Sequence, residues 1–291
     1  MTFNIWNSGA NVDRGLYKIA KHIRIVDADV IAIQEVQYNW TMSNLLSRLG
    51  PGYYGYAFDT ANPNTGIITK HEIDLSTLIR TSASVGFKIT LLNSKKSINF
   101  YSLHLTYRNY GPYAANYKNV VDSKVIDLGE KGRVANVQAI IDDPGFQAQV
   151  QSAASGGIPL IVAGDFNSPS HLDWIESTKH LHGDWVYEWP ANKLISDNAS
   201  LTDSFRAVNP DPLCAPGNTW STVHKSFTTE WEGVIPDVYD RIDFILFNSP
   251  KLIPVDSFIY SGSLPLKPQP KHFYNDYPSD HFAVVTDFLY Q

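Results

Sequence analysis

Short apolar runs alternate along this chain with segments whose apolar residues recur at helical spacing. The runs at 29–34 (DVIAIQ) and 159–163 (PLIVA) are typical of buried strands, whereas residues 13–26 keep their apolar side chains on one helical face. Two further strand-like runs, at 85–92 and 98–105, follow each other closely, which favours antiparallel pairing. We therefore predict a mixed α/β (α+β) protein with one hydrophobic core.

The same periodicities predict the other elements. Further strands are expected at 2–6, 53–58, 66–69, 241–247 and 282–289. Further helices are expected at 42–49 with Thr41 as cap, at 133–154 with an interruption at Asp143-Pro144-Gly145, and at 171–178. Residues 106–132 and 181–240 are predicted to be long loops, the second with short elements, and long loops are usually functional.

The composition limits the class of protein. The chain has 291 residues, a formal net charge of −6 and 18% charged residues, as expected of one globular domain over 1–291. Cys214 is the only cysteine, which excludes an internal disulfide and a cysteine-based zinc site. No apolar run predicts a transmembrane segment. No signal peptide is recognisable, but the chain starts inside a predicted strand, so we expect a trimmed N-terminus and leave a secreted or cytoplasmic location open.

Polar residues that can do chemistry lie where the predicted strands end. They are Asn4, Glu35, His104, Asp165, Asn167, Asp243, Asp280 and His281. Active sites of open sheets are assembled at strand ends, so these side chains are expected to meet. The two histidines are candidates for proton transfer or for stabilising a transition state.

The spacing of these residues favours phosphoryl chemistry. Asp165 and Asn167 are two positions apart and point the same way on an extended backbone, so a carboxylate and a carboxamide lie together. Glu35 and Asp280 offer hard oxygen ligands, and Asn4 can add a carbonyl oxygen. Few carboxylates, completed by water and substrate phosphate, are the usual arrangement around Mg²⁺.

Five motifs in a fixed order carry a family resemblance. They are Gln34-Glu35, Ser102-Leu103-His104, Gly164-Asp165-Phe166-Asn167, Arg241-Ile242-Asp243-Phe244 and Ser279-Asp280-His281-Phe282. This set resembles the endonuclease/exonuclease/phosphatase superfamily, with its DNase I-like fold, over essentially the whole chain. The resemblance implies a four-layer α-β-β-α sandwich of two mixed, mainly antiparallel sheets. It also implies hydrolysis of a phosphoester by water with a divalent metal, Mg²⁺ or Mn²⁺, with Ca²⁺ also compatible.

The resemblance also implies roles for the residues of the motifs. Glu35 is then the principal metal ligand, Asn4 lies near the metal and the phosphate, and Asp280 is a metal ligand or supports one. The metal polarises a phosphoryl oxygen while positioned groups activate water for in-line attack.

On the protein side, the resemblance implies that Asp165 orients or deprotonates the attacking water. Asn167 holds a phosphate oxygen, and Asp243 pairs with His281, whose ring contacts the scissile phosphate. His104 lies near the leaving group. The identity of the general base stays open between these groups.

Several residues outside the motifs are weaker candidates for binding substrate. Arg108, with Tyr107 and Tyr110, is expected to line the cleft, the alternative being a solvated loop arginine. His171 either reaches the substrate or packs at a helix end. An aromatic rim, or simple packing, is expected of Trp185, Trp189, Trp220 and Trp231.

The leading function is therefore a metal-dependent phosphoester hydrolase, acting on a phosphodiester or a phosphomonoester. The acidic charge and the lack of a dense Lys/Arg stripe slightly favour a small-molecule or lipid-headgroup substrate over nucleic acid. A DNA or RNA nuclease is the alternative, and a catalytically silent binding protein of the same fold is a remote one. No obligatory protein partner is inferred.

Overall fold

The most apolar runs of the sequence form central strands of two sheets. The structure is a computed structural model that describes residues 1–224 and 235–291. Strand β2 (Val30–Val36) and strand β8 (Leu160–Asp165) are buried along almost their whole length. A strand buried on both faces is a continuous apolar run in the sequence, which is why both strands could be predicted.

Within the described residues, the strands form two six-stranded sheets. The first sheet has the order β11-β12-β1-β2-β4-β3, and the second has the order β5-β6-β7-β8-β10-β9. The pairs β1–β2 and β7–β8 are parallel and the other neighbouring pairs are antiparallel, so both sheets are mixed, as predicted. The remaining strands are β1 (Thr2–Asn4), β3 (Tyr54–Ala57), β4 (Asn64–Thr69), β5 (Glu72–Arg80), β6 (Ser84–Thr90), β7 (Ser97–His104), β9 (Thr202–Asp203), β10 (Asp243–Asn248), β11 (Leu252–Tyr260) and β12 (Ala283–Tyr290).

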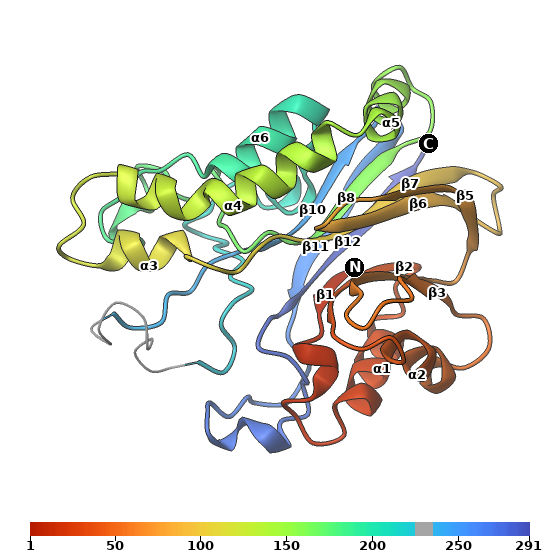
Figure 1. Ribbon diagram of the computed structural model, residues 1–291, viewed down its shortest axis with the longest axis horizontal. Coiled ribbons are helices and arrows are strands. Elements are labelled where there is room, and N and C mark those ends of the chain that lie inside the picture. Colours follow the sequence, from red (N-terminus) through yellow and green to blue (C-terminus); the bar gives the residue numbers. More distant parts are fainter. Residues whose placement is uncertain (225–234) are drawn as a thin grey trace.

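Helices cover the outer faces of both sheets, which gives the four layers that the resemblance implied (Figure 1). Helices α1 and α2 bury their apolar faces against the first sheet, and α4, α5 and α6 bury theirs against the second. A third core fills the space between the sheets, with Ala32 on one side and Phe87 and Ile161 on the other. The helices are α1 (Gly15–Val26), α2 (Thr41–Leu49), α3 (Gly111–Asn116), α4 (Lys124–Ile141), α5 (Pro144–Ala154), α6 (Pro190–Ala199) and α7 (Ser204–Val208).

The strand register brings polar residues from distant parts of the chain to one end of the sheets. In the second sheet, Asp165 pairs with His104 of β7 on one side and with Asp243 of β10 on the other. In the first sheet, Asn4 pairs with Gln34, next to Glu35. Neighbouring strands are about 5 Å apart, so the three central residues of the second sheet are held within reach of one another.

Two predictions of secondary structure were wrong. Residues 106–132 are not a continuous loop, because they contain α3 and the first turns of α4. The face that α4 buries there carries the polar pair Glu130 and Arg133, so helical periodicity of apolar residues is lost. Residues 171–178 are a series of turns rather than a helix, with Thr178 Oγ1 donating to Asp173 O at 2.5 Å.

Two strands could not be predicted from the pattern of apolar residues. Strand β5 has no buried residue and strand β11 contains Pro254, and each lies at an edge of its sheet. Edge strands carry few apolar residues and tolerate proline, so they leave a weak pattern. The predicted break after α4 is confirmed, since Asp143 caps α5 by accepting a hydrogen bond from Phe146 N at 3.0 Å. No helix in residues 1–224 or 235–291 has the length and apolar character needed to cross a membrane.

Candidate active site

The Asp165 carboxylate connects polar side chains from both sheets. Its Oδ2 accepts a hydrogen bond from Asn4 Nδ2 of the first sheet at 2.9 Å. The same oxygen lies 3.6 Å from His104 Nε2 and 3.7 Å from His281 Nε2. Its Oδ1 accepts from the backbone N–H of Asn167 at 2.7 Å, which fixes the carboxylate plane. Three nitrogen atoms therefore surround one carboxylate oxygen that is almost completely buried.

A glycine allows β8 to carry Asp165 into this position. A Cβ on Gly164 would lie 2.0 Å from Leu103 O of β7, closer than any side chain permits. The close approach of the two strands places Asp165 directly beside His104 in the parallel register. The glycine of the Gly-Asp-Phe-Asn motif is thus required by the site geometry.

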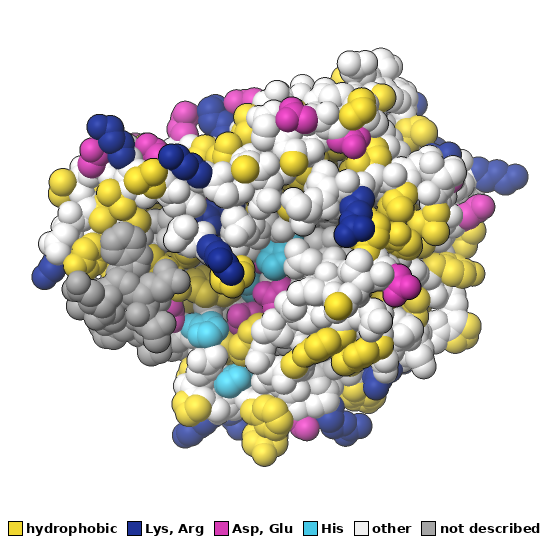
Figure 2. Space-filling view, in the orientation of Figure 1, with side chains coloured by type: hydrophobic (Ala, Val, Ile, Leu, Met, Phe, Trp, Pro, Cys, Tyr) yellow, Lys and Arg dark blue, Asp and Glu magenta, His cyan; other side chains and the backbone are white. Residues whose placement is uncertain are grey.

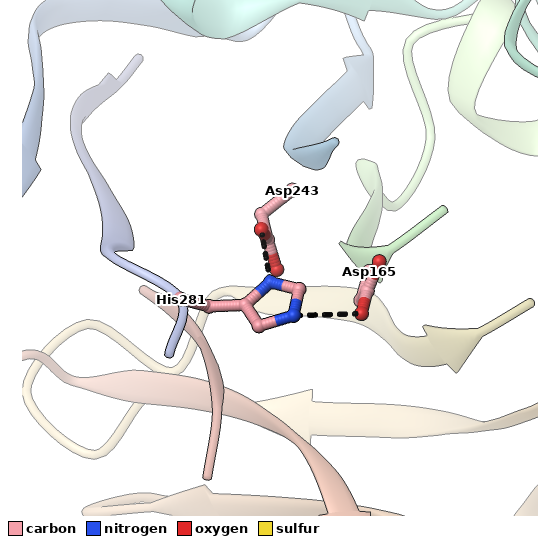
Figure 3. Close-up of side chains that lie close together, drawn as sticks. All are labelled: Asp165, Asp243 and His281. Atoms are coloured by element: carbon pink, nitrogen blue, oxygen red, sulfur yellow. Dashed lines mark hydrogen bonds and ion pairs between the residues drawn. The ribbon is translucent and has the colours of Figure 1, made fainter. Parts of the chain in front are cut away.

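His281 connects Asp165 to a second buried aspartate (Figure 3). Its Nδ1 donates to Asp243 Oδ2 at 2.9 Å, so the opposite nitrogen, Nε2, faces Asp165. Burial alone would lower the pKa of His281, but the negative charges of Asp243 and Asp165 outweigh it and raise that pKa well above its usual value. Burial raises the pKa of Asp243 to about 6, although the charge of His281 opposes this. We therefore expect a protonated, positively charged His281 at neutral pH.

Glu35 and Asp280 form a second group of carboxylates, separated from Asp165 by the side chain of Asn4. Glu35 has a φ of 61° at a bulge in β2, which turns its side chain toward the site. Its Oε2 accepts from Asn7 N at 2.6 Å, and its Oε1 accepts from Asn4 Nδ2 at 3.2 Å. Burial and the negative charge of Asp280 raise the pKa of Glu35.

This pair of carboxylates suits a divalent cation. Asp280 Oδ1 is buried and has no hydrogen-bond partner among the described residues, so it is free to coordinate. Within residues 1–224 and 235–291, no Lys or Arg contributes to the pKa shift of Glu35, and two hard oxygen donors are the donor set that Mg²⁺ and Mn²⁺ prefer. Asp165, Asp243 and His281 also lie close enough together to bind a metal. However, one oxygen of Asp243 and one nitrogen of His281 are already hydrogen-bonded to each other.

The side-chain amide of Asn4 lies between Glu35 and Asp165. Its Oδ1 accepts a hydrogen bond from Trp6 N at 3.0 Å, so the amide presents Nδ2, not oxygen, to Glu35 and Asp165. Asn4 is completely buried, and Ser279 donates to its backbone oxygen at 2.7 Å. In this arrangement the Nδ2 of Asn4 links the carboxylates of the two sheets, and its Oδ1 faces the backbone of Trp6.

His104 is oriented by a residue that the sequence did not indicate. Its Nδ1 lies 2.8 Å from Asn64 Oδ1 of β4, so the ring joins the two sheets and turns Nε2 toward Asp165. Asn64 is forty positions away in sequence and belongs to no motif, so only the tertiary structure reveals it. Thr219 is a second such residue, since its Oγ1 accepts from Asp243 N at 3.2 Å.

Two cavities open on either side of Glu35. The larger, of about 650 Å³, has His104 in its wall, and the smaller, of about 220 Å³, has His281 and Asp280 in its wall. Glu35 and Tyr107 line both. Figure 2 shows the hollow in this face, where acidic and histidine side chains come together. Glu35 is thus reached from two cavities, one of which also exposes His104 and the other His281 and Asp280.

The other predicted binding residues lie further out. Arg108 is exposed beside Tyr107 and is not among the residues that line either cavity. His171 lies near α6, where burial and the charge of Lys193 lower its pKa, and it lines neither cavity. Asn167 lines the smaller cavity, and its Nδ2 donates to Leu105 O at 3.0 Å.

The predicted aromatic rim is present only in part. Tyr107, Tyr110 and Trp220 line the smaller cavity. Trp189 is fully buried and packs against Trp174, and Trp185 lies beside this cluster. Trp231 lies outside the described residues.

The comparison with known families agrees with this geometry. The sequence profile described as "Endonuclease/Exonuclease/phosphatase family" matches residues 1–281. The chain belongs to this family. Over 293 aligned residues it is 46% identical to the uncharacterized protein F14F9.5 of Caenorhabditis elegans, and the match covers all of this chain and 90% of that protein.

Solved structures of this superfamily share the fold at low sequence identity. The mannosyl-6-phosphatase of Bacteroides thetaiotaomicron VPI-5482 is 15% identical with a TM-score of 0.57, covering 99% of this chain and 98% of its own. The TDP2 protein of D. rerio, complexed with a single-strand DNA product, is 15% identical with a TM-score of 0.58. The match covers 99% of this chain and 96% of the TDP2 chain. The family relationship places this chain among phosphoesterase folds without naming its substrate.

Proposed function

We propose that this protein is a divalent-metal-dependent hydrolase that cleaves a phosphoester by direct attack of water. The observation that carries the proposal is the arrangement around Asp165, whose Oδ2 is shared by Asn4, His104 and His281. A buried carboxylate between two imidazole rings, next to the pair of carboxylates of Glu35 and Asp280, fits a site that binds a metal and a phosphoryl group together.

Glu35 and Asp280 are the residues that would hold the cation, Mg²⁺ or Mn²⁺, with Ca²⁺ as a further candidate. When bound, the cation polarises a phosphoryl oxygen and neutralises the charge of the two carboxylates. The raised pKa of Glu35 and the unpartnered Oδ1 of Asp280 both support this choice. Asn4 holds Glu35 in place through its Nδ2.

The hydrogen-bonded residues on the other side would act on water and phosphate. Asp165 orients the attacking water and accepts its proton. His281, positively charged and held by Asp243, donates from Nε2 to a phosphoryl oxygen as negative charge develops. His104 faces the larger cavity and is placed to donate a proton to a leaving oxygen there, and Asn167 holds a second phosphate oxygen.

The two cavities support a substrate with a substituent on each side of the phosphorus. Among the described residues that line them, none is Lys or Arg. A nucleic-acid groove needs cationic contacts to the backbone phosphates, so a small-molecule or lipid-headgroup ester is favoured over DNA or RNA. The fold itself is compatible with both, since one similar structure is a sugar phosphatase and another holds a DNA product.

A phosphoester panel tests the proposal. The protein would be assayed with Mn²⁺ or Mg²⁺, and with EDTA, on an aryl phosphodiester, an aryl phosphomonoester, supercoiled plasmid and a choline phospholipid. We expect EDTA-sensitive cleavage of at least one small ester that exceeds plasmid nicking. Hydrolysis that is equal with EDTA contradicts the metal requirement, and no hydrolysis of any member contradicts the enzyme.

A matched pair of variants tests the metal assignment separately. Glu35→Gln removes the charge of a proposed ligand, and we expect Mn²⁺ affinity, measured by calorimetry, to fall by roughly a hundredfold or more. Glu72→Gln, on the exposed start of β5, is the control and should bind Mn²⁺ as the unmodified protein does. Equal affinities for both variants would place the metal elsewhere.

A further inference from the structure

The larger cavity beside the site differs in chemistry from the site itself. It encloses about 650 Å³, within the range of about 300–1,000 Å³ that small-molecule pockets occupy. Glu35 and His104 form the part of its wall that faces the reacting centre. A substituent of the phosphorus that leaves toward His104 would therefore enter this cavity.

Neutral hydrogen-bonding side chains make up most of the cavity wall. They are Asn7, Gln37, Asn62, Asn64, Ser82, Thr106 and Asn136. Glu35 is the only charged carboxylate among its lining residues, and it belongs to the proposed metal site. Among the described lining residues, Tyr107 is the only Phe, Tyr or Trp, and it is 66% exposed, while the ring of His104 is turned toward Asp165. The wall thus offers many neutral donors and acceptors, and its polar surface exceeds its apolar surface.

Hydrogen bonds within the chain hold one end of each side-chain amide. Asn62 Nδ2 donates to Gln37 Oε1 at 3.0 Å, and Asn64 Oδ1 accepts from His104 at 2.8 Å. Asn136 Oδ1 accepts from Thr106 N at 3.0 Å. The opposite atoms, Asn62 Oδ1 and the amide nitrogens of Gln37, Asn64 and Asn136, have no hydrogen-bond partner in the described part of the chain. Asn64 and Asn136 are therefore oriented in advance, Gln37 and Asn62 pair at the exposed mouth of the cavity, and all four keep a polar atom for a ligand.

We infer that this cavity binds an uncharged, polyhydroxylated alcohol, a sugar or polyol, as one substituent of the phosphoester. The inference rests on the proposed hydrolase function. A hydroxyl both donates and accepts, so it matches a wall that presents oriented amide nitrogens and an amide oxygen. A further phosphate on the ligand would need Lys or Arg, and an acyl chain would need apolar walls. A nucleobase would need an enclosed stacking surface, which a single exposed tyrosine does not provide.

The first test compares two esters of similar length. Sorbitol 6-phosphate and hexyl phosphate, with their methyl diesters, differ in the hydroxyl groups of the alcohol. With Mn²⁺ bound, we expect kcat/KM to be at least about tenfold higher for the sorbitol esters, because several neutral hydrogen bonds form only with them. Equal kcat/KM for the sorbitol and hexyl esters, or a preference for nucleoside 5′-monophosphate, would overturn the inference while leaving the hydrolase intact.

The second test measures binding without turnover. Saturation-transfer NMR with free sorbitol reports contact between the alcohol and the protein, whether or not any ester is cleaved. We expect a signal that the double variant Gln37→Ala/Asn62→Ala weakens and that Asn198→Ala, an exposed residue of α6, leaves unchanged. The double variant should also lower the ratio of kcat/KM for sorbitol over hexyl esters by about tenfold.

The outcomes separate the two proposals. Sorbitol binding that the double variant weakens, without hydrolysis of any ester, supports the assignment of the cavity and contradicts the proposed hydrolase. Hydrolysis without sorbitol binding, and with an unchanged ester ratio in the double variant, supports the hydrolase and contradicts the assignment of the cavity.

Discussion

His281 owes its orientation and its charge to two aspartates. Asp243 accepts from its Nδ1, and Asp165 lies on the opposite side at Nε2. Both negative charges act against the burial of the ring, which is why the pKa of His281 is raised instead of lowered. A histidine held in this way can donate to a phosphoryl oxygen without first reorienting.

Replacing Asp243 tests this role at the level of one residue. In Asp243→Asn the amide keeps the shape of the side chain but removes the charge that keeps His281 protonated. We expect kcat to fall by roughly a hundredfold or more, in the range that a positioned acid contributes. Asp256→Asn, an exposed residue of β11, is the control. Near-normal turnover in Asp243→Asn, at an unchanged melting temperature, would refute the role.

The motifs of the sequence identified most of the residues that meet at the site, but not how they meet. Asp165, Asp243 and His281 could be predicted because each follows or interrupts an apolar run in a recognisable order. The direction of the Asn4 amide could not be predicted, since it depends on Trp6 N donating a hydrogen bond to Asn4 Oδ1. The contact of His104 with Asn64 could not be predicted either, because it depends on the packing of one sheet against the other.

Among the elements, α4 shows most clearly why a pattern of apolar residues is incomplete. Arg133 is fully buried and forms an ion pair with Glu130. It also donates to the backbone oxygens of Thr106 and Asn109, in the segment that leads away from His104. Helix α4 therefore buries a charged pair whose Arg133 binds the backbone of residues 106–109. Because these buried side chains are polar, the sequence here has the pattern of a solvated loop.

Replacing Arg133 tests the role of this helix. Arg133→Met leaves Glu130 buried without its partner, so we expect the free energy of unfolding to fall by about 3–5 kcal/mol. The double variant Glu130→Gln/Arg133→Met should recover part of the loss, because no unpaired charge remains. Urea unfolding measures both, with the exposed Lys131→Met as control. A loss below about 1 kcal/mol would contradict a structural role for the pair.

At the scale of the whole molecule, the site exists only because two sheets pack face to face. Asn4 and Glu35 come from the first sheet, and Asp165 and Asp243 come from the second. The layer order could be predicted from the family resemblance, whereas the register that aligns Asp165 with its neighbours could not. Register depends on strand pairing over long sequence separations, which a single sequence does not encode locally.

Global stability also depends on a carboxyl group that the proposed chemistry does not use. Asp240 is buried, and it accepts hydrogen bonds from Trp174 Nε1 at 2.9 Å and from the hydroxyl of Tyr110 at 3.4 Å. Burial, with the charge of Asp173, raises the pKa of Asp240 to about 7. His182 Nδ1 lies 3.6 Å from Asp240 Oδ1. However, burial lowers the pKa of His182 to about 4, so His182 carries no compensating charge at neutral pH.

The raised pKa predicts the direction in which pH changes stability. An unfolded aspartate releases its proton near pH 4, whereas folded Asp240 keeps its proton up to about pH 7. Between these values the folded state binds the extra proton, so this contribution to stability is present at low pH and is lost as pH rises through 7. Asp240→Asn is neutral throughout and still accepts from Trp174.

We therefore compare the free energy of unfolding of Asp240→Asn with that of the unmodified protein. We expect the difference, variant minus unmodified, to be about 2–4 kcal/mol larger at pH 8 than at pH 5. Urea unfolding at both pH values measures the difference, and Asp256→Asn on the exposed edge strand should show no such change. A difference that is the same at both pH values would mean that Asp240 releases its proton as readily in the folded protein as in the unfolded chain. Its burial against Trp174 would then carry no electrostatic cost.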